Sequence, residues 1–209
     1  KTETQRKQID SAKTRFLSIT SHELRSPMTP MRAQLQMLSR GYFGKLAPKQ
    51  RNSVQTVLRN ANRLDTILKD FLDISRIEAG RLKLNIKKID LKKLITETAK
   101  LNENYLPEKK LKITANVPAL PPVQTDPDRI TQVLSNLLTN ASKFSPPKST
   151  ITITAQPLSK HVLVSVKDQG IGISPKDQQK LFQPFAQVEQ TLAREHQGTG
   201  LGLAICKGF

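Results

Sequence analysis

The chain has 209 residues, of which 36% are hydrophobic and 4% are aromatic, and it contains no tryptophan. One compact core of this size would be thin, so we expect an elongated or oligomeric molecule of one or two domains. The formal net charge is +17, the single Cys206 excludes an intrachain disulfide, and no apolar run is long enough to span a membrane.

Residues 3–40 are predicted to form one long helix, because apolar or small residues recur there at spacings of three and four. These positions are Ile9, Ala12, Phe16, Ile19, Leu24, Met28, Met31, Leu35 and Leu38. The phase slips once, between Ile19 and Leu24, and Pro27 and Pro30 are expected to bend the helix just beyond the slip.

A second helix is predicted from Pro48 to near Gly80. Its apolar repeat comprises Val54, Val57, Ala61, Leu64, Leu68 and Phe71. Two helices joined by a short loop form an antiparallel hairpin whose apolar seam is half covered. A homodimer that closes a four-helix bundle is the simplest way to cover the rest.

The pattern changes after Gly80, where short alternating segments mix with helical ones. In chain order we expect a strand at 82–86, a helix from the cap Asp90 to about Leu106, a strand at 111–117, a helix at 127–143 after the Asp126-Pro127 cap, and a hairpin of strands at 151–155 and 162–166. This mixture predicts a second domain, an α/β sandwich. The domains are therefore expected at 1–80 and 81–209.

His22 is the first candidate for chemistry. It lies two positions from both Thr20 and Leu24, about 200° around the helix, so its side chain is expected to point away from the seam. An exposed imidazole beside the carboxylate of Glu23 can act as a nucleophile. Taken alone, an ordinary surface histidine is the simpler explanation.

The predicted helix at 127–143 carries a polar stripe beside its apolar face. The stripe comprises Arg129, Gln132, Asn136, Asn140 and Lys143, and the apolar face comprises Ile130, Val133, Leu134, Leu137, Leu138 and Ala141. Carboxamide oxygens can bind Mg²⁺, and an ammonium group can bind phosphate. A polar side facing solvent explains the stripe equally well.

Two glycine clusters follow. Asp168 comes directly after a predicted strand and precedes Gly170 and Gly172, so a purine amine could donate to its carboxylate; an ordinary turn is the alternative. The second cluster opens a helix, where free backbone N–H groups favour phosphate; it comprises Gly198, Thr199, Gly200, Leu201 and Gly202. About 25 residues separate the clusters, and Phe182, Pro184 and Phe185 could anchor this loop by packing.

Five segments in this order resemble the boxes of the sensor histidine kinases of two-component signalling. Residues 16–27 resemble the H box, 132–144 the N box, 168–172 the first glycine box, 181–185 the F box and 198–203 the second glycine box. The resemblance covers nearly the whole chain, and five boxes in the family order make it very specific.

The resemblance implies a dimerisation and phosphoacceptor domain followed by an ATP-binding domain of the Bergerat type. His22 would accept the γ-phosphoryl group of ATP, with Glu23 as its base. The phosphoryl group would then pass to an aspartate of a response-regulator receiver domain, which this chain lacks. The hinge would lie near Gly80, because the two domains must move to meet.

The resemblance also assigns the nucleotide contacts. Asn140 would bind Mg²⁺ with help from Asn136, Lys143 would contact phosphate, Phe144 would line the site and Asp168 would accept from the adenine amine. The glycines of residues 198–202 would serve the lid and the phosphates.

The sequence departs from the family in two respects. Ser26 stands four residues after His22, where the family more often has threonine or asparagine at a position that helps its phosphatase activity. The chain stops at Phe209, shortly after the last glycine box, so we expect a C-terminally truncated sandwich. Because it begins at Lys1 rather than methionine, we expect a cytoplasmic piece of a longer protein with an upstream sensor domain, whose membrane anchoring stays open.

Two alternatives remain. One is an ATP-binding scaffold or phosphatase of the same fold without kinase activity. The other is a nucleic-acid binder, which the charge invites and which predicts steep salt dependence. Residues 81–112 hold ten basic and four acidic residues, +6 of the +17, and no basic run is interleaved with aromatics. We therefore expect a general preference for anions and no specific nucleic acid.

Overall fold

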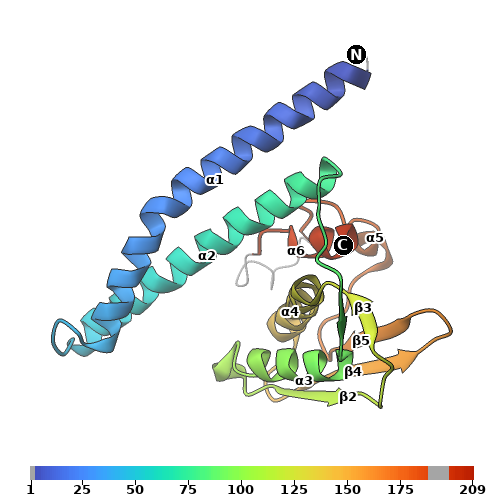
Figure 1. The fold of residues 1–209 in the computed structure, drawn as a ribbon. Coiled ribbons are helices and arrows are strands. Elements are labelled where there is room, and N and C mark those ends of the chain that lie inside the picture. The colour runs from blue at the N-terminus through green and yellow to red at the C-terminus, as the bar shows by residue number, and fades with distance from the viewer. Residues whose placement is uncertain (1–2, 188–197) are drawn as a thin grey trace. The chain divides into compact units, whose positions relative to one another are not determined.

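The computed structural model describes residues 3–187 and 198–209. The chain divides into two compact units, Lys1–Leu82 and Lys83–Phe209, both drawn in Figure 1. No helix in the described part of the chain is long and apolar enough to cross a membrane.

The first unit is a hairpin of two long helices, α1 (Glu3–Arg40) and α2 (Pro48–Glu78), as predicted (Figure 1). Pro27 and Pro30 lie inside α1, which nonetheless continues as one helix. The connecting turn starts at Gly41, whose φ of +81° suits a glycine. Helix α2 starts with a proline in its first turn, and the backbone N–H of Ala47 donates to Gln50 Oε1 at 2.9 Å.

The apolar repeats of α1 and α2 are only partly covered within the hairpin, as predicted. On α2 the less exposed positions repeat at four and three residues and include Leu58, which was not predicted; they are Val54, Leu58, Ala61, Asp65, Leu68 and Leu72. Several predicted seam residues are exposed: Phe16, Ile19, Leu24, Met31, Val57 and Leu64. The side chains of Ile9 and Ala12 lie outside the described residues. The hairpin therefore keeps a second apolar surface of its own.

A polar contact fixes which sides of the two helices meet. Asp65 of α2 accepts from Arg25 Nε at 3.1 Å through Oδ1, and from Arg32 Nη1 at 3.5 Å through Oδ2. The two arginines flank both prolines of α1. One carboxylate thus joins α2 to α1 on either side of the segment where the α1 ladder lacks two N–H donors.

The second unit contains two small sheets and several helices. In chain order its elements are β1 (Lys87–Ile89), α3 (Leu91–Asn102), a 3₁₀ turn η1 (Pro107–Lys109), β2 (Lys112–Asn116), β3 (Val123–Thr125), α4 (Pro127–Phe144), β4 (Thr150–Pro157), β5 (Val162–Lys167), α5 (Pro175–Gln178) and α6 (Gly202–Gly208). Strands β1 and β3 pair antiparallel. Strand β4 lies between β2, which is parallel to it, and β5, which is antiparallel. The α/β prediction is confirmed.

Two boundaries predicted here are wrong. The segment 82–86 forms no strand. The strand is instead β1, which directly follows this segment, because only the three residues of β1 pair with β3. The helix capped by Asp90 ends at Asn102 rather than near Leu106. Strand β3 was not predicted, since three residues after a proline-rich loop show no measurable alternation.

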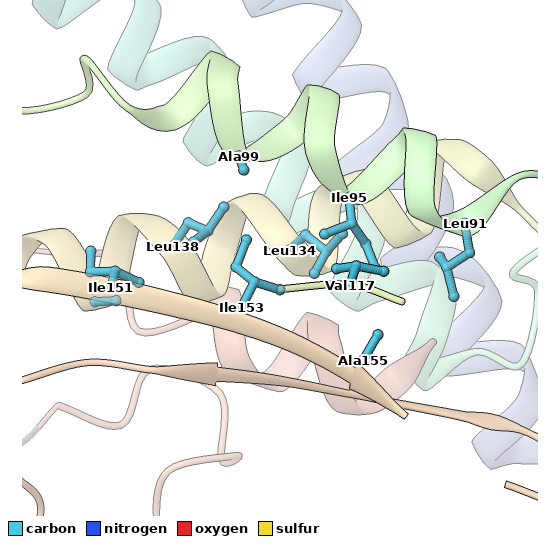
Figure 2. Packing of buried hydrophobic residues seen from close by; sticks show 10 residues of the cluster. Leu91, Ile95, Ala99, Val117, Leu134, Leu138, Ile151, Ile153 and Ala155 are labelled. Carbon is cyan, nitrogen blue, oxygen red and sulfur yellow. The ribbon is translucent and has the colours of Figure 1, made fainter. Parts of the chain in front are cut away.

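The core of this unit lies between α3, α4 and the three-stranded sheet. Figure 2 shows Ile95 and Ala99 of α3 and Leu134 of α4 turned toward Ile153 of β4. Alternate residues of β4 are buried, as expected for a strand with one face on a core. The fully buried members include Ile95, Leu138, Ile151 and Ile153.

Helix α4 begins at a buried cap, Asp126. Its Oδ1 accepts from the backbone N–H groups of Asp128 at 3.0 Å and Arg129 at 3.2 Å, and its Oδ2 accepts from Asn85 N–H at 2.8 Å. These bonds, that from Asn85 above all, lower the pKa of Asp126 below its usual 3.8. The cap thereby also ties the chain before β1 to the start of α4.

We expect Asp126→Ala to lower the free energy of unfolding at pH 7 by about 1 kcal/mol, a typical cost of losing an N-cap. Because the folded-state pKa is lowered, the stabilisation is fully present above the unfolded pKa of 3.8 and disappears as the pH falls through the folded-state pKa. In urea unfolding, the difference in free energy of unfolding between wild type and variant should therefore narrow as the pH falls from 7 to 3. The exposed Glu103→Ala is the control and should follow the wild type. A gap that stays constant down to pH 3 would contradict this account.

Candidate functional site

His22 is carried on the outside of α1. Its side chain is 81% exposed, whereas the neighbouring Ser21 is buried, so the prediction that the imidazole points away from the seam is confirmed. Nδ1 lies 3.6 Å from Glu23 Oε1, just beyond hydrogen-bond distance. The carboxylate thus stands on the Nδ1 side of the ring, which leaves Nε2 as the nitrogen available for a reaction partner.

The polar stripe of α4 is not a plain solvent-facing side. Gln132, Asn136, Asn140 and Lys143 are all half-buried, while Leu134 and Leu138 on the other face are buried in the core. Near its start, Arg129 Nη1 donates to Gln132 Oε1 at 2.9 Å. The stripe is therefore partly covered by other residues rather than fully open to solvent.

Asn136 connects α4 to the second glycine cluster. Its Nδ2 donates to the carbonyl oxygen of Gly202, the first residue of α6, at 3.2 Å and lies 3.7 Å from Cys206 Sγ. A Cβ at Gly202 would stand 3.4 Å from the Asn136 carboxamide carbon, so the two residues are in van der Waals contact range. The two predicted motifs, 66 residues apart, are thus brought together.

The first glycine cluster meets the end of α4. Gly170 donates its N–H to Asp168 Oδ1 at 2.8 Å, in an Asx-type turn directly after β5. A Cβ at Gly170 would lie only 2.9 Å from the carbonyl oxygen of Phe144. A glycine is therefore required at this position, since any side chain would push the turn off α4.

The second glycine cluster is held by backbone contacts. Phe185 N–H donates to the carbonyl oxygen of Gly200 at 3.0 Å, and a Cβ on Gly200, whose φ is +71°, would approach Phe185 to 2.8 Å. Gln187 Nε2 also donates to the carbonyl oxygen of Gly198, at 2.8 Å. These bonds join the two ends of segment 188–197, which itself lies outside the described residues.

The F-box rings are only partly packed, and the centre of the Phe182 ring lies 5.7 Å from Lys207 Nζ of α6. Phe182 is 47% and Phe185 is 61% exposed. The main chain of Phe185 also anchors the loop and adopts a positive φ of 63°. The sequence carried no signal for this, because neither residue spacing nor hydropathy reports a backbone conformation.

The candidate metal ligand is a carboxamide rather than an acidic cluster. Within residues 3–187 and 198–209, no group of three or more His, Cys, Asp or Glu could hold a metal ion. Asn140 lies one helical turn after Asn136 on the half-buried side of α4. An ion held here would take one protein oxygen and fill its remaining positions from phosphate and water, as Mg²⁺ does in nucleotide sites.

Two family models match the chain. Residues 12–80 match the His Kinase A (phospho-acceptor) domain, and residues 125–209 match the family of histidine kinase-, DNA gyrase B-, and HSP90-like ATPases. His22 lies in the first match, while the α4 stripe and both glycine clusters lie in the second.

Curated relatives match over almost the whole chain. The chain is 35% identical over 205 residues to the non-motile and phage-resistance protein of Caulobacter vibrioides, which covers 96% of this chain and 24% of that protein. It is 36% identical over 205 residues to the circadian input-output histidine kinase CikA of Synechococcus elongatus, covering 95% of this chain and 27% of CikA. The chain thus spans about a quarter of the length of these relatives.

Solved structures of histidine kinases are also similar to this chain. Full-length ShkA in complex with AMPPNP superposes with a TM-score of 0.73 at 29% identity, over 93% of this chain and 40% of ShkA. The histidine kinase AdeS of Acinetobacter baumannii gives a TM-score of 0.60 at 30% identity, over 90% of this chain and 84% of AdeS. The chain belongs to the sensor histidine kinase family.

Proposed function

We propose that this chain is the catalytic core of a protein-histidine kinase that phosphorylates its own His22 with ATP and passes the phosphoryl group to an aspartate of a response regulator. Residues 1–80 would dimerise and carry the acceptor, and residues 81–209 would bind ATP. The observation that carries the proposal is the exposed His22 imidazole with a carboxylate on its Nδ1 side. A buried or seam-facing imidazole could not reach a triphosphate held by another domain.

The chemistry at His22 follows from the positions of its two nitrogens. The lone pair of Nε2 forms a bond to the γ-phosphorus of ATP, while the bond from that phosphorus to the β,γ-bridging oxygen breaks and ADP leaves. The ring proton on Nδ1 passes to Glu23, so the phosphorylated imidazole stays neutral. The distance of 3.6 Å needs only a small rotation of the exposed Glu23 side chain to become a hydrogen bond.

The nucleotide would lie against the half-buried side of α4. Lys143 would contact phosphate, Phe144 would line the adenine region, and Asp168 would accept from the adenine amine. The close contact between Gly170 and the Phe144 carbonyl supports the pairing of the last two regions, because it joins the turn after β5 to the end of α4. Phosphoryl transfer depends mainly on such positioning and on charge neutralisation.

The residues present also fit Mg²⁺. Asn140 offers a carboxamide oxygen on the same helix face as Asn136 and Lys143, the donor type that suits a hard cation bridging phosphates. Bound Mg²⁺ would neutralise charge on the β- and γ-phosphates. Asn136 would assist, although here its amide nitrogen is bonded to Gly202, so its part would be to hold the second glycine cluster beside the metal ligand.

A homodimer would complete the first unit. Leu24 and Met31 of α1 and Val57 and Leu64 of α2 are each seven residues apart and all exposed, although they belong to the apolar repeats of their helices. Heptad-spaced apolar residues are the usual packing surface of helical bundles. The second surface on the hairpin would be buried by another copy, which gives a four-helix bundle.

The first test is incubation with γ-labelled ATP and Mg²⁺. We expect acid-labile, base-stable label on the wild type and none on His22→Gln, which removes the nucleophilic nitrogen. The matched control is His161→Gln, an exposed histidine of the β4–β5 turn, which should keep its label. Label that persists in His22→Gln would reject this acceptor, and ATP binding without any label would favour the scaffold or phosphatase alternative.

The metal assignment is tested with Asn140→Ala. We expect the dissociation constant of Mg-ATP, measured by calorimetry, to rise about tenfold or more, because one partner of a strongly charged group is lost. Asn116→Ala, an exposed asparagine on β2, is the control and should bind normally. Unchanged affinity in Asn140→Ala would show that the metal is held elsewhere.

The dimer is tested by light scattering. The wild type should have roughly twice the chain mass of 23.4 kDa, whereas Leu64→Glu, which places a charge in the proposed interface, should shift the mass toward the monomer. Gln55→Glu adds the same charge at an exposed polar position of α2 and should leave the dimer intact. A monomeric wild type would contradict the bundle.

A further inference from the structure

A lysine outside all five boxes is bonded to the helix that carries the nucleotide residues. Lys109, the last residue of η1, is half-buried, and its Nζ donates to the carbonyl oxygens of Ser142 and Ser145, both at 3.0 Å, and of Lys143. An ammonium group has three N–H donors, so all three are used on one turn of main chain.

This turn is the C-terminus of α4, where such bonds matter most. The last carbonyls of a helix have no partner within the helix, and the end carries partial negative charge. A cation that donates to them satisfies both needs at once. The turn also contains Ser145, which is buried and ends the helix in an extended conformation.

The main chain of Lys109 holds the same turn from the other side. Its carbonyl oxygen accepts from Lys148 N–H at 2.8 Å, and Lys112 N–H donates to Ser149 O at 3.1 Å. The loop that follows α4 is therefore fixed to the η1–β2 segment by backbone bonds, while the ammonium group fixes the helix end itself. Lys109 is a brace between two segments 33 to 36 residues apart.

We infer that Lys109 is a positioning residue for the nucleotide site: it fixes the last turn of α4 so that Phe144 keeps its place against Gly170 and Lys143 keeps its place on the half-buried side of α4. The inference rests on the proposed function for the identity of the ligand. The link to the site is the Phe144 carbonyl, which packs so closely on Gly170 that no Cβ fits there. A loosened turn would move this carbonyl, and with it the start of the first glycine cluster.

The test compares Lys109→Met with two controls in the 209-residue chain. Lys112→Met removes the same charge from an exposed position three residues away, and Ala99→Gly weakens the core of the same unit without touching the turn. Two quantities are measured well below the melting temperature: the dissociation constant of a non-hydrolysable ATP analogue with Mg²⁺, and the amide hydrogen exchange of residues 142–145 and 168–172.

We expect Lys109→Met to weaken analogue binding about tenfold, the effect of losing hydrogen bonds to a charged group, while both controls stay within about twofold of the wild type. Exchange should accelerate in both segments of Lys109→Met and in neither segment of Lys112→Met. Lys109→Arg keeps the charge but cannot place three donors of one nitrogen on three carbonyls, so it should fall between wild type and Lys109→Met.

Affinity and exchange equal to those of Lys112→Met would overturn the inference. So would a binding loss in Ala99→Gly as large as that in Lys109→Met, since general destabilisation would then explain both. If Lys109→Met does not fold, the same two measurements are made on Lys109→Arg. An affinity for the analogue equal to that of the wild type would then overturn the inference. Should the wild type bind no nucleotide, the proposed function fails, whereas the exchange measurement still tests the brace.

Discussion

Helix α4 has an apolar face that packs in the core and a polar face beside the glycine clusters, and the rest of the second unit depends on this double packing. One side packs Leu134 and Leu138 against α3 and the sheet, which holds the helix rigidly in the core. The other side keeps Asn136, Asn140 and Lys143 half-buried beside the glycine clusters. In the proposed site, a helix held rigidly by the core would present these side chains in fixed orientations, because its backbone would not have to be ordered when a nucleotide binds.

The glycines make this arrangement possible by letting main chain approach main chain. Gly170 lies against the Phe144 carbonyl and Gly200 against the backbone of Phe185, and in both places a Cβ would collide with a neighbouring segment. In each case the glycine joins two of the recognised boxes. Two pairs of the motifs whose order along the chain indicated the family are thus in contact in space, although each motif was only a moderate signal alone.

The sequence was informative wherever burial imposes a period. The two long helices, α4 with its Asp126 cap, and the β4–β5 hairpin were all predicted, because each repeats its apolar residues at helical or strand spacing. Prediction failed where a period is absent, and also at residues 82–86, where alternating apolar residues form no strand because they have no strand partner among the described residues. Strands β1 and β3 have three residues each and are specified only by pairing with one another. A three-residue segment cannot display alternation that differs from chance.

Several contacts around the candidate site could not be predicted from the sequence. Spacing placed Asn136 and Asn140 on one face of a helix, yet it could not show that Asn136 bonds to Gly202, since that contact joins segments 66 residues apart. The positive φ of Phe185 was likewise invisible, because phenylalanine seldom adopts it. The contacts of Arg25 and Arg32 with Asp65 between the two helices were also not predicted, because a hydropathy pattern locates only apolar contacts.

The contact of Arg25 and Arg32 with Asp65 is also related to the direction in which the His22 imidazole points. Neighbouring residues on a helix point about 100° apart, so the direction in which His22 faces depends on which side of α1 is turned toward α2. Asp65 settles this by holding two guanidinium groups that lie seven positions apart, one of them only three residues from His22. Rotating α1 about its axis by the equivalent of one residue would turn the imidazole by about 100° and separate Arg25 and Arg32 from Asp65. The orientation of α1 that leaves His22 exposed is thus the one in which both arginines contact Asp65 of α2.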